Sequence, residues 1–548
     1  MLTSFDAGEV KGCGSVVPIL TTSDVEDAVT IVAQMGPEPF VQAMEAEPDF
    51  DIIIGGRAYD PSPFVAFCIF QTSQLSGVSG TTLTSQQLGG FTHMGKIMEC
   101  GALCATPKSS SAMATVYRDG TFDIKPLSPN TRCTPSSVAA HTLYEKSRPD
   151  ILPGPGGNLD LTHSSYAQLP DEKSVRVQGA TFQFSRDIDL PYTVKLEAAK
   201  VVGHRTIFMG GIRDPILIKQ MPLFQTRIRE YVSAQISILE STTNFWKLGF
   251  HTYGAHGIMG ASEPGDPEYQ PQEIFLVGEV LASSQALANS VASSARIACV
   301  HGAYPGQRGT GGNFAMGVGG KMEIEMGPCA EFCIYHLIPL GIGEEGAKRV
   351  DESREGDFLE RRSDSKPPLF SWKMSAIGKG DGSVAPKPVA PSSSATTPDS
   401  PTQSRKYSIR GNPSTLNLTS PETLTDIAPI IRSKNSGPYE ITLDVVFSSL
   451  PIYNIIKAAT LLSPETISGM YHLKEEEVIW CGFYDQAMAW KCTIPRRREA
   501  VVGEDEIVAF ANGGFMESDV HASQQYAGLL DLELGEEIKE KIRSLKLE

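Results

Sequence analysis

The residues whose types and spacing best suit chemistry are His93, Glu99 and Cys100. If this stretch is helical, His93, Lys96 and Cys100 share one face, and Glu99 lies one step round it. A face that carries a base, an acid and a thiol suits proton transfer, and the thiol is a weaker candidate nucleophile. Cys104 continues the face, but zinc sites usually use tighter cysteine pairs, so no metal is expected. Each residue taken alone is more commonly packed or half-exposed, and that alternative stays open.

A second group of candidates follows an apolar run at residues 51–60. Three isoleucines precede Gly55, Gly56, Arg57 and Asp60, a pattern typical of a buried strand that ends in a tight polar turn. In an open parallel sheet such a turn lies at the carboxyl edge, where ligands bind. The glycines would let the backbone approach a ligand, and the arginine could hold a carboxylate or phosphate. The alternative is an ordinary connection in which Arg57 pairs with Asp60.

The glycine-dense loop at residues 300–314 supplies a third group. Its backbone N–H groups could face an anion, with Arg308 and Asn313 as further donors. The loop lacks the lysine and the spacing of a P-loop, so nucleotide hydrolysis is not expected, and a plain flexible connection explains the glycines as well. We expect residues 55–60, 93–104 and 304–313 to approach one another. In that shared site Arg57 and Asn313 would hold an anion, and His93 or Glu99 would act as acid or base.

Helix and strand signals alternate along the chain, which predicts an α/β fold whose partly parallel sheet is followed by a β-rich or α+β portion. Apolar spacing predicts one helix over 24–35 and another over 39–46, ahead of the strand at 51. Further helices are expected at 64–70, from 89 onward, and at 134–145, 216–239 and 284–300. Strands are expected at 114–117, 122–124, 174–179, 192–196, 205–209, 273–281 and 331–337.

Composition divides the chain into four parts. Residues 1–345 form the large α/β domain. Residues 346–424 are charged and then rich in Pro and Ser, which predicts a disordered linker because such a sequence buries too little apolar surface to offset ordering entropy. Residues 425–533 carry the signals of a small α+β domain that can fold alone. Residues 534–548 are expected to form a helical or frayed tail.

The whole chain has the composition of a large globular protein, with 548 residues that are 41% hydrophobic and 20% charged. A net charge of -17 argues against a nucleic-acid partner, because neutralising phosphates needs a basic face. No apolar run approaches the ~20 residues that span a bilayer, and no secretory leader is evident. The ten cysteines lack the spacing of a disulfide framework. We therefore expect a cytoplasmic protein with reduced thiols, no evident cofactor and a small-molecule partner, and self-association stays open.

An ordered set of short phrases runs through the large domain. The phrases are Phe50-Asp-Ile-Ile-Ile-Gly-Gly-Arg-Ala-Tyr-Asp60, His93-Met-Gly-Lys-Ile-Met-Glu-Cys100, His141-Thr-Leu-Tyr-Glu145, Gly157-Asn-Leu-Asp-Leu-Thr162, Tyr304-Pro-Gly-Gln307 and Gly311-Gly-Asn313. Together they resemble the acyclic terpene utilisation (AtuA-like) family, from near residue 15 to near residue 345. Two later phrases, Arg432-Ser-Lys-Asn-Ser-Gly-Pro438 and Ser523-Gln-Gln-Tyr526, look like a second, uncharacterised domain that accompanies AtuA-like proteins as a separate chain or as a fusion.

This resemblance implies an enzyme of acyl-CoA or branched carboxylic acid metabolism, in a family without a settled reaction. The first hypothesis is a hydratase- or dehydratase-type lyase acting on a carboxylate or a CoA thioester, in a catabolic or secondary-metabolite pathway. The alternative is a non-catalytic binding or assembly subunit of a metabolic complex. Fused forms of this kind look like fungal proteins. Members usually carry an upstream glycine-containing strand and further βα units, so the resemblance also predicts a shortened N-terminus here.

Overall fold

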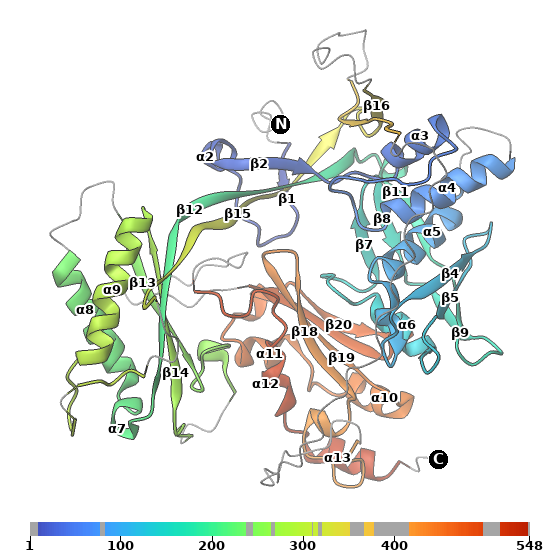
Figure 1. The fold of residues 1–548 in the computed structure, drawn as a ribbon. Helices are drawn as coiled ribbons and strands as arrows, with labels where there is room; N and C mark the ends of the chain where they lie inside the picture. The colour runs from blue at the N-terminus through green and yellow to red at the C-terminus, as the bar shows by residue number, and fades with distance from the viewer. Residues whose placement is uncertain are drawn as a thin grey trace, which may run out of the picture.

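Two long antiparallel strands form the spine of the protein. The computed structural model describes residues 9–76, 83–236, 245–264, 269–309, 311–315, 321–350, 367–376, 416–496 and 516–545. Strand β12 (Tyr192–Ile212) pairs with β15 (Ile324–Leu340) along almost their whole length. Alternate side chains of β12, among them Val194, Leu196 and Ala198, are buried, as the period of two of a half-buried strand requires. The spine connects two lobes that lie far apart (Figure 1).

The spine belongs to a six-stranded sheet with the order β1-β15-β12-β14-β13, and β2 pairs with the free part of β12. Every pairing within this sheet is antiparallel. The remaining strands of the sheet are β1 (Lys11–Gly12), β2 (Ala28–Ala33), β13 (Trp246–Tyr253) and β14 (Ile274–Ala282). Parallel pairing in the described ranges is confined to the Met35–Ala58 bridge and to β16 (Ala347–Arg349) with β17 (Phe370–Trp372).

The second lobe, residues 204–315, packs helices on one face of β13 and β14 (Figure 1). Its helices are α7 (Pro215–Ile218), α8 (Met221–Ile236) and α9 (Gln285–His301). Helix α8 buries the side chains that recur every three or four residues, namely Met221, Phe224, Ile228, Val232 and Ile236. This lobe holds the large apolar core around Phe208 and Leu276.

The first lobe, residues 34–188, combines helices with two small antiparallel sheets, β4-β5-β10-β9 and β11-β8-β7. The helices are α3 (Glu38–Ala46), α4 (Ser62–Ser76), α5 (Ser85–Met98) and α6 (Pro135–His141). The strands are β4 (Ala112–Val116), β5 (Phe122–Pro126), β7 (Ile151–Gly154), β8 (Gly157–Asp160), β9 (Ser165–Gln168), β10 (Val175–Gln178) and β11 (Thr181–Phe184). Capping boxes at Thr84 and Thr134 fix where α5 and α6 begin.

The C-terminal domain, residues 416–545, is a four-stranded antiparallel sheet with short helices. Its strand order is β18-β19-β21-β20, and the domain lies between the two lobes, beneath the spine in Figure 1. The strands are β18 (Ile430–Ser436), β19 (Glu440–Val446), β20 (Trp480–Tyr484) and β21 (Ala489–Pro495), and the helices are α10 (Leu450–Ala458), α11 (Pro464–Met470), α12 (Ala527–Leu530) and α13 (Glu536–Arg543). Its core includes Trp490, whose side chain is fully buried.

The predicted mixed α/β class, with a small additional C-terminal domain, is confirmed. Most of the predicted linker, residues 351–366 and 377–415, lies outside the described residues. The short strand β17 falls within the predicted linker and pairs with β16. Over the predicted tail the chain forms α13, which buries Ile542 against the domain core.

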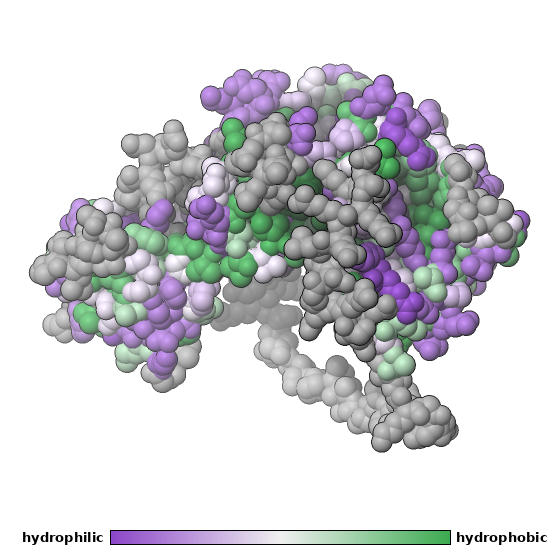
Figure 2. All heavy atoms as spheres, turned by 90° about the horizontal axis from the view of Figure 1, so that it is seen from above, coloured by the Kyte–Doolittle hydropathy of each residue, from purple (hydrophilic) through white to green (hydrophobic). Residues whose placement is uncertain are grey.

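Two local predictions near the N-terminus were wrong. Residues 28–33 form strand β2 rather than the middle of a helix, because the β-branched run Val29-Thr-Ile-Val32 pairs with β12. Residues 51–54 form no strand, and Ile52 and Ile54 are 78% and 91% exposed. No neighbouring strand in the described chain pairs with this segment, so Ile52 and Ile54 face solvent while Ile53 packs against the cluster around Phe40. The face that lies at the top of Figure 1 mixes apolar with hydrophilic surface (Figure 2).

None of the helices in the described ranges is both long and apolar enough to cross a bilayer.

Candidate functional site

The C-terminal domain packs directly against the first lobe. A buried apolar cluster joins the two parts, with members from the end of α6 and from the C-terminal domain: Ala139, Ala140, Leu143, Val446, Tyr484, Ala487 and Ala489. Removing these side chains from water supplies a non-directional driving force for the contact. The position of the domain on the lobe is fixed by directional contacts beside the cluster.

A buried charge network provides these directional contacts. Lys491, whose side chain is fully buried, donates one hydrogen bond to Asp444 Oδ1 and another to the Leu143 carbonyl, each 2.9 Å long. Arg432 donates to Asp444 Oδ2 and to the Ala140 carbonyl, at 3.0 Å in both cases. The last carbonyls of a helix lack partners within the helix, and cations are favoured there. The C-terminal domain thus adds hydrogen bonds to one carbonyl in the last turn of α6 and to one just after it.

A cleft of about 890 Å³ opens where the first lobe, the spine and the C-terminal domain meet. Its walls combine charged and polar side chains with apolar ones. From the first lobe and the spine come Arg57, Tyr59, Asp60, Glu99, Lys146 and Glu197. From the C-terminal domain come Asn435, Ser436, Glu440, Trp480 and Arg496. The volume lies within the range of about 300–1,000 Å³ that is usual for small-molecule sites.

Lys146 is the side chain of the cleft best prepared for proton transfer. Its ammonium group has no hydrogen-bond partner among the described residues, and it lies 5.5 Å from the centroid of the Tyr59 ring. Burial lowers the pKa of Lys146 to about 7, the charge of Lys96 acts in the same direction, and Glu99 opposes both. Lys195 lowers this pKa further and Asp60 raises it. Near neutral pH a large fraction of Lys146 is therefore an uncharged amine that can accept a proton.

Tyr59 and Glu99 each present a buried polar atom that has no partner within the described chain. These atoms are the Tyr59 hydroxyl and Glu99 Oε2, while Glu99 Oε1 accepts a hydrogen bond from Lys96. Burial raises the pKa of Glu99, although Lys96 and Lys146 oppose the shift, and burial also raises the pKa of Tyr59. Because buried polar groups are usually hydrogen-bonded, two such atoms beside Lys146 fit a site that a ligand completes.

Arg57 lines the cleft, but its charge is already neutralised. It donates to Glu197 through Nε at 2.5 Å and Nη2 at 3.2 Å, and to Asp60 through Nη1 at 3.1 Å. Lys195 also pairs with Glu197, at 3.0 Å. Burial works to raise the pKa of Glu197, yet Arg57 and Lys195 hold it below its ordinary value. The pairing of Arg57 with Asp60, which the sequence left open as the alternative to anion binding, is therefore present.

His93 lies away from the cleft, in the core of the first lobe. Its side chain is fully buried, and its ring meets Phe122 and Tyr166 edge to face at centroid distances of 5.4 and 5.9 Å. Burial lowers the pKa of His93 to about 3, so the ring is neutral at physiological pH. His93 lines neither this cleft nor the apolar cavity described below.

The glycine-rich loop lies in the second lobe, on the other side of the spine from α5 (Figure 1). It packs on that lobe through Gln220, which donates to the Pro305 carbonyl at 2.9 Å. Within the loop, Asn313 donates to the Gly302 carbonyl at 2.7 Å and accepts from Gln307 at 3.2 Å. Neither Asn313 nor the exposed Arg308 lines the cleft. The expected meeting of three stretches thus reduces to two, residues 57–60 and 96–99.

The other predicted residues lie at or near the edge of the cleft without lining it. Gly55 and Gly56 precede Arg57, and a side chain at Gly55 would collide with the Phe40 ring. Cys100 is half-buried directly after Glu99, and burial raises the pKa of its thiol, with Glu99 adding to the shift. Across the residues that the structure describes, no group of three or more His, Cys, Asp or Glu side chains is arranged to hold a metal ion.

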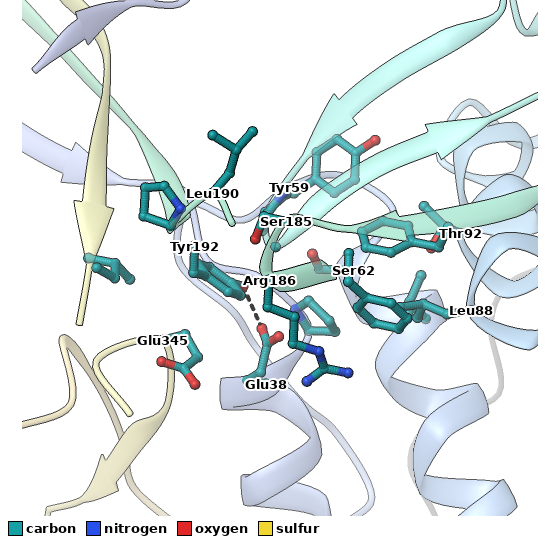
Figure 3. Close-up of a pocket in the computed structure, with 18 of the residues that line it drawn as sticks. Glu38, Tyr59, Ser62, Leu88, Thr92, Ser185, Arg186, Leu190, Tyr192 and Glu345 are labelled. Atoms are coloured by element: carbon teal, nitrogen blue, oxygen red, sulfur yellow. Dashed lines mark hydrogen bonds between the residues drawn. The ribbon is translucent and has the colours of Figure 1, made fainter. Parts of the chain in front are cut away.

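An apolar cavity of about 530 Å³ adjoins the cleft and shares Tyr59 and Pro155 with it. Its walls are largely hydrocarbon, from residues such as Val65, Leu88, Phe182 and Leu190. At one end Glu38 and Tyr192 point toward one another, and the Tyr192 hydroxyl donates to Glu38 at 2.8 Å (Figure 3). Burial raises the pKa of Glu38 to about 7.

Sequence reasoning missed Lys146, Tyr59 and the contribution of the C-terminal domain. Lys146 follows a short helix and belongs to no motif of its own. The one available clue is its position, directly after the phrase that runs from His141 to Glu145. The lowered pKa of Lys146 comes from burial and from the charge of Lys96, which lies far from it in the sequence.

Comparisons with known proteins agree with this two-part construction. Residues 424–533 match a domain described as Domain of unknown function (DUF4387). No curated protein and no solved structure matches the chain. Residues 11–318 match the family described as Acyclic terpene utilisation family protein AtuA. Because this match covers more than half of the chain, the protein belongs to the AtuA family, and it carries the DUF4387 domain fused to its C-terminal side.

Proposed function

We propose that the protein is an enzyme that removes a proton from the carbon beside a carbonyl group, and that the cleft at the domain junction is its active site. The observation that carries this proposal is the convergence of Lys146, Tyr59 and Glu99 on the cleft. The amine of Lys146 and one polar atom on each of the other two have no hydrogen-bond partner in the described chain. Base, donor and acid are the parts that such a reaction needs.

In this reaction the neutral amine of Lys146 accepts the proton from carbon, and the electron pair of the broken C–H bond moves toward the carbonyl. The Tyr59 hydroxyl donates a hydrogen bond to the carbonyl oxygen as negative charge develops there. Collapse of the resulting enolate expels a hydroxyl group from the next carbon, and protonated Glu99 delivers the proton that makes the leaving group water. The reverse sequence adds water to a double bond, so the reaction class is that of a hydro-lyase.

The substrate class that we propose is a branched carboxylic acid or its CoA thioester. The cleft, where Lys146, Tyr59 and Glu99 lie, would take the carbonyl end. The adjoining apolar cavity, which shares Tyr59 with the cleft, gives space for a hydrocarbon part. Membership of a family named for terpene utilisation supports a substrate of this kind.

Deuterium exchange tests the proposed proton transfer directly, whichever complete reaction it belongs to. The full-length protein is incubated in D₂O with a panel of acyl-CoA thioesters and branched carboxylates, and mass spectrometry follows deuterium at the carbon beside the carbonyl. Wild type should catalyse exchange on at least one compound, and Lys146→Met should abolish it. The control Lys541→Met changes a lysine of α13 that is 55% exposed, and it should exchange like wild type.

Two outcomes would sink the proposal. One is an equal exchange rate in wild type and K146M. The other is the absence of exchange on every compound of the panel. Tight binding of a panel compound without any exchange would instead support the alternative of a non-catalytic binding or assembly subunit.

A further inference from the structure

The main chain on either side of Lys146 is held by the C-terminal domain. On the preceding side, Lys491 of β21 donates to the Leu143 carbonyl at 2.9 Å. On the following side, Thr493 of the same strand donates to the Ser147 carbonyl at 2.8 Å. These two donors come from one strand of the other domain and fall on both flanks of the proposed base.

The residue directly before Lys146 has an unfavourable backbone conformation. Glu145 has a φ of 55°, in the left-handed region that residues with a side chain rarely adopt. Ser436 of β18 donates to the Glu145 carbonyl at 3.4 Å, and Lys434 of the same strand lies 3.7 Å from the Glu145 carboxylate. Surrounding contacts must hold a residue in such an unfavourable conformation, and here the C-terminal domain provides these contacts.

The side chain of Ser147, on the other flank of Lys146, is bound by the same domain. Its hydroxyl donates to the Glu440 carboxyl group and lies 3.0 Å from the Ser436 hydroxyl. Lys146 itself has no hydrogen bond within the described chain that would fix its position. The orientation of its amine toward Tyr59 therefore depends on how the flanking backbone is held.

We propose that the C-terminal domain is the positioning element of the active site, in which Thr493, Ser436 and Lys491 hold the backbone around Lys146 and thereby keep its amine inside the cleft. This inference rests on the proposed function of the cleft. It assigns the fused domain a task in the chemistry of the large domain, through positioning residues that do not touch the substrate. Loss of these contacts would let residues 145–147 move toward water and carry Lys146 with them.

The test compares two buried threonines of the same sheet in the full-length protein. Thr493→Val removes a hydroxyl that donates across the domain junction, to Ser147. Its matched control Thr442→Val removes a hydroxyl that donates at 3.1 Å to Lys434, within the C-terminal domain. Thr493 and Thr442 are both fully buried and lie opposite one another on neighbouring strands.

The readout is the titration of the Lys146 amine itself. Competitive acetylation with acetic anhydride over a series of pH values, followed by mass spectrometry of the Lys146 peptide, gives the apparent pKa of that residue. Wild type and T442V should titrate near pH 7. T493V, alone or with Ser436→Ala, should raise the apparent pKa toward the ordinary value of lysine, because a loosened segment exposes the amine to water. Thr493→Ser keeps the hydroxyl and should restore the wild-type titration.

An unchanged Lys146 titration in T493V with S436A, relative to T442V, would overturn the inference. If T493V fails to fold, S436A and T493S provide the same comparison. The exchange assay separates this failure from failure of the proposed function. If the Lys146 titration shifts in T493V but wild type catalyses no deuterium exchange, the positioning role is supported and the proposed catalytic role of Lys146 is refuted. If wild type catalyses deuterium exchange but the Lys146 titration does not shift in T493V, the catalytic role is supported and the positioning role is refuted.

Discussion

The buried ion pair between Asp444 and Lys491 allows a quantitative test of how the C-terminal domain is held. Asp444→Asn keeps the shape of the side chain and removes its charge, which leaves Lys491 fully buried without a counter-charge. Breaking a buried pair in this way typically costs about 3–5 kcal/mol. The upper limit follows from the alternative open to Lys491, which is to release its proton, at about 5 kcal/mol for an ordinary lysine at pH 7. D444N should therefore lower the free energy of unfolding by about 3–5 kcal/mol.

Lys491→Met should cost less than D444N. Asp444 keeps its hydrogen bond from Arg432 in that variant, so the main loss is the partner of the Leu143 carbonyl, at about 1–3 kcal/mol. The double variant should be more stable than the sum of the single changes predicts, because the unpaired charge that makes D444N costly is gone. Raising the pH toward 9 should also reduce the cost of D444N, since Lys491 then loses its proton more easily.

Urea unfolding followed by tryptophan fluorescence measures these differences, because Trp490 is buried in the core of the C-terminal domain. Glu537→Gln is the matched control. It removes the charge of a carboxylate that pairs with Lys541 at 2.6 Å on the surface of α13, with its own side chain 81% exposed, and it should leave the unfolding midpoint unchanged. The reasoning would be refuted if D444N unfolded like E537Q, or if K491M were the more costly single change.

Three further predictions concern the cleft and the cavity beside it. The rate of deuterium exchange should fall about tenfold per pH unit below pH 7, as Lys146 becomes protonated, and a rate that rises on acidification would contradict its role as base. Arg57→Ala should change KM by less than about threefold, because Glu197 already neutralises the arginine. A rise in KM of about tenfold would instead show that Arg57 binds the anionic group of the substrate. The folded protein raises the pKa of Glu38 to about 7, so the stability from its protonated form is complete below its ordinary pKa of 4.5 and is lost as the pH rises through 7. Thermal unfolding of Glu38→Gln should therefore show a gain in midpoint relative to wild type between pH 5 and pH 8, and parallel curves would disprove this.

Elements with a strong local signal were predictable from the sequence. The hairpin of β4 and β5 forms around Asp119-Gly120, where the turn needs a residue with positive φ, and Gly120 has a φ of 88°. The strand, helix and strand that became β14, α9 and β15 were also found, because their periodicities are long and regular.

The segment at residues 51–60 shows where local patterns mislead. Three consecutive isoleucines favour a strand, but a strand forms against a neighbour, and the sequence does not show whether one is present. In the fold, Arg57 and Asp60 of this segment reach the cleft while Ile52 and Ile54 face solvent. The sequence therefore predicted the position of the polar half of the segment, whereas the strand predicted for its apolar half does not form.

The site itself depends on contacts between distant residues, which no single-sequence pattern reveals. Glu99 was a candidate from the sequence because it lies on a predicted helix with other residues that can take part in proton transfer. Lys146 was not, because its lowered pKa arises from burial between parts of the chain that meet after folding. The contribution of Thr493 and Lys491 depends on the docking of a domain that begins hundreds of residues later.

The most direct test of the central claim is a crystal structure of K146M bound to a compound that wild type exchanges. The carbonyl end of the ligand should lie in the cleft between the first lobe and the C-terminal domain. Its oxygen should be within about 3 Å of the Tyr59 hydroxyl, and the exchanging carbon should face position 146. A ligand bound at the glycine-rich loop of residues 304–313, or anywhere else away from Tyr59 and Glu99, would contradict it.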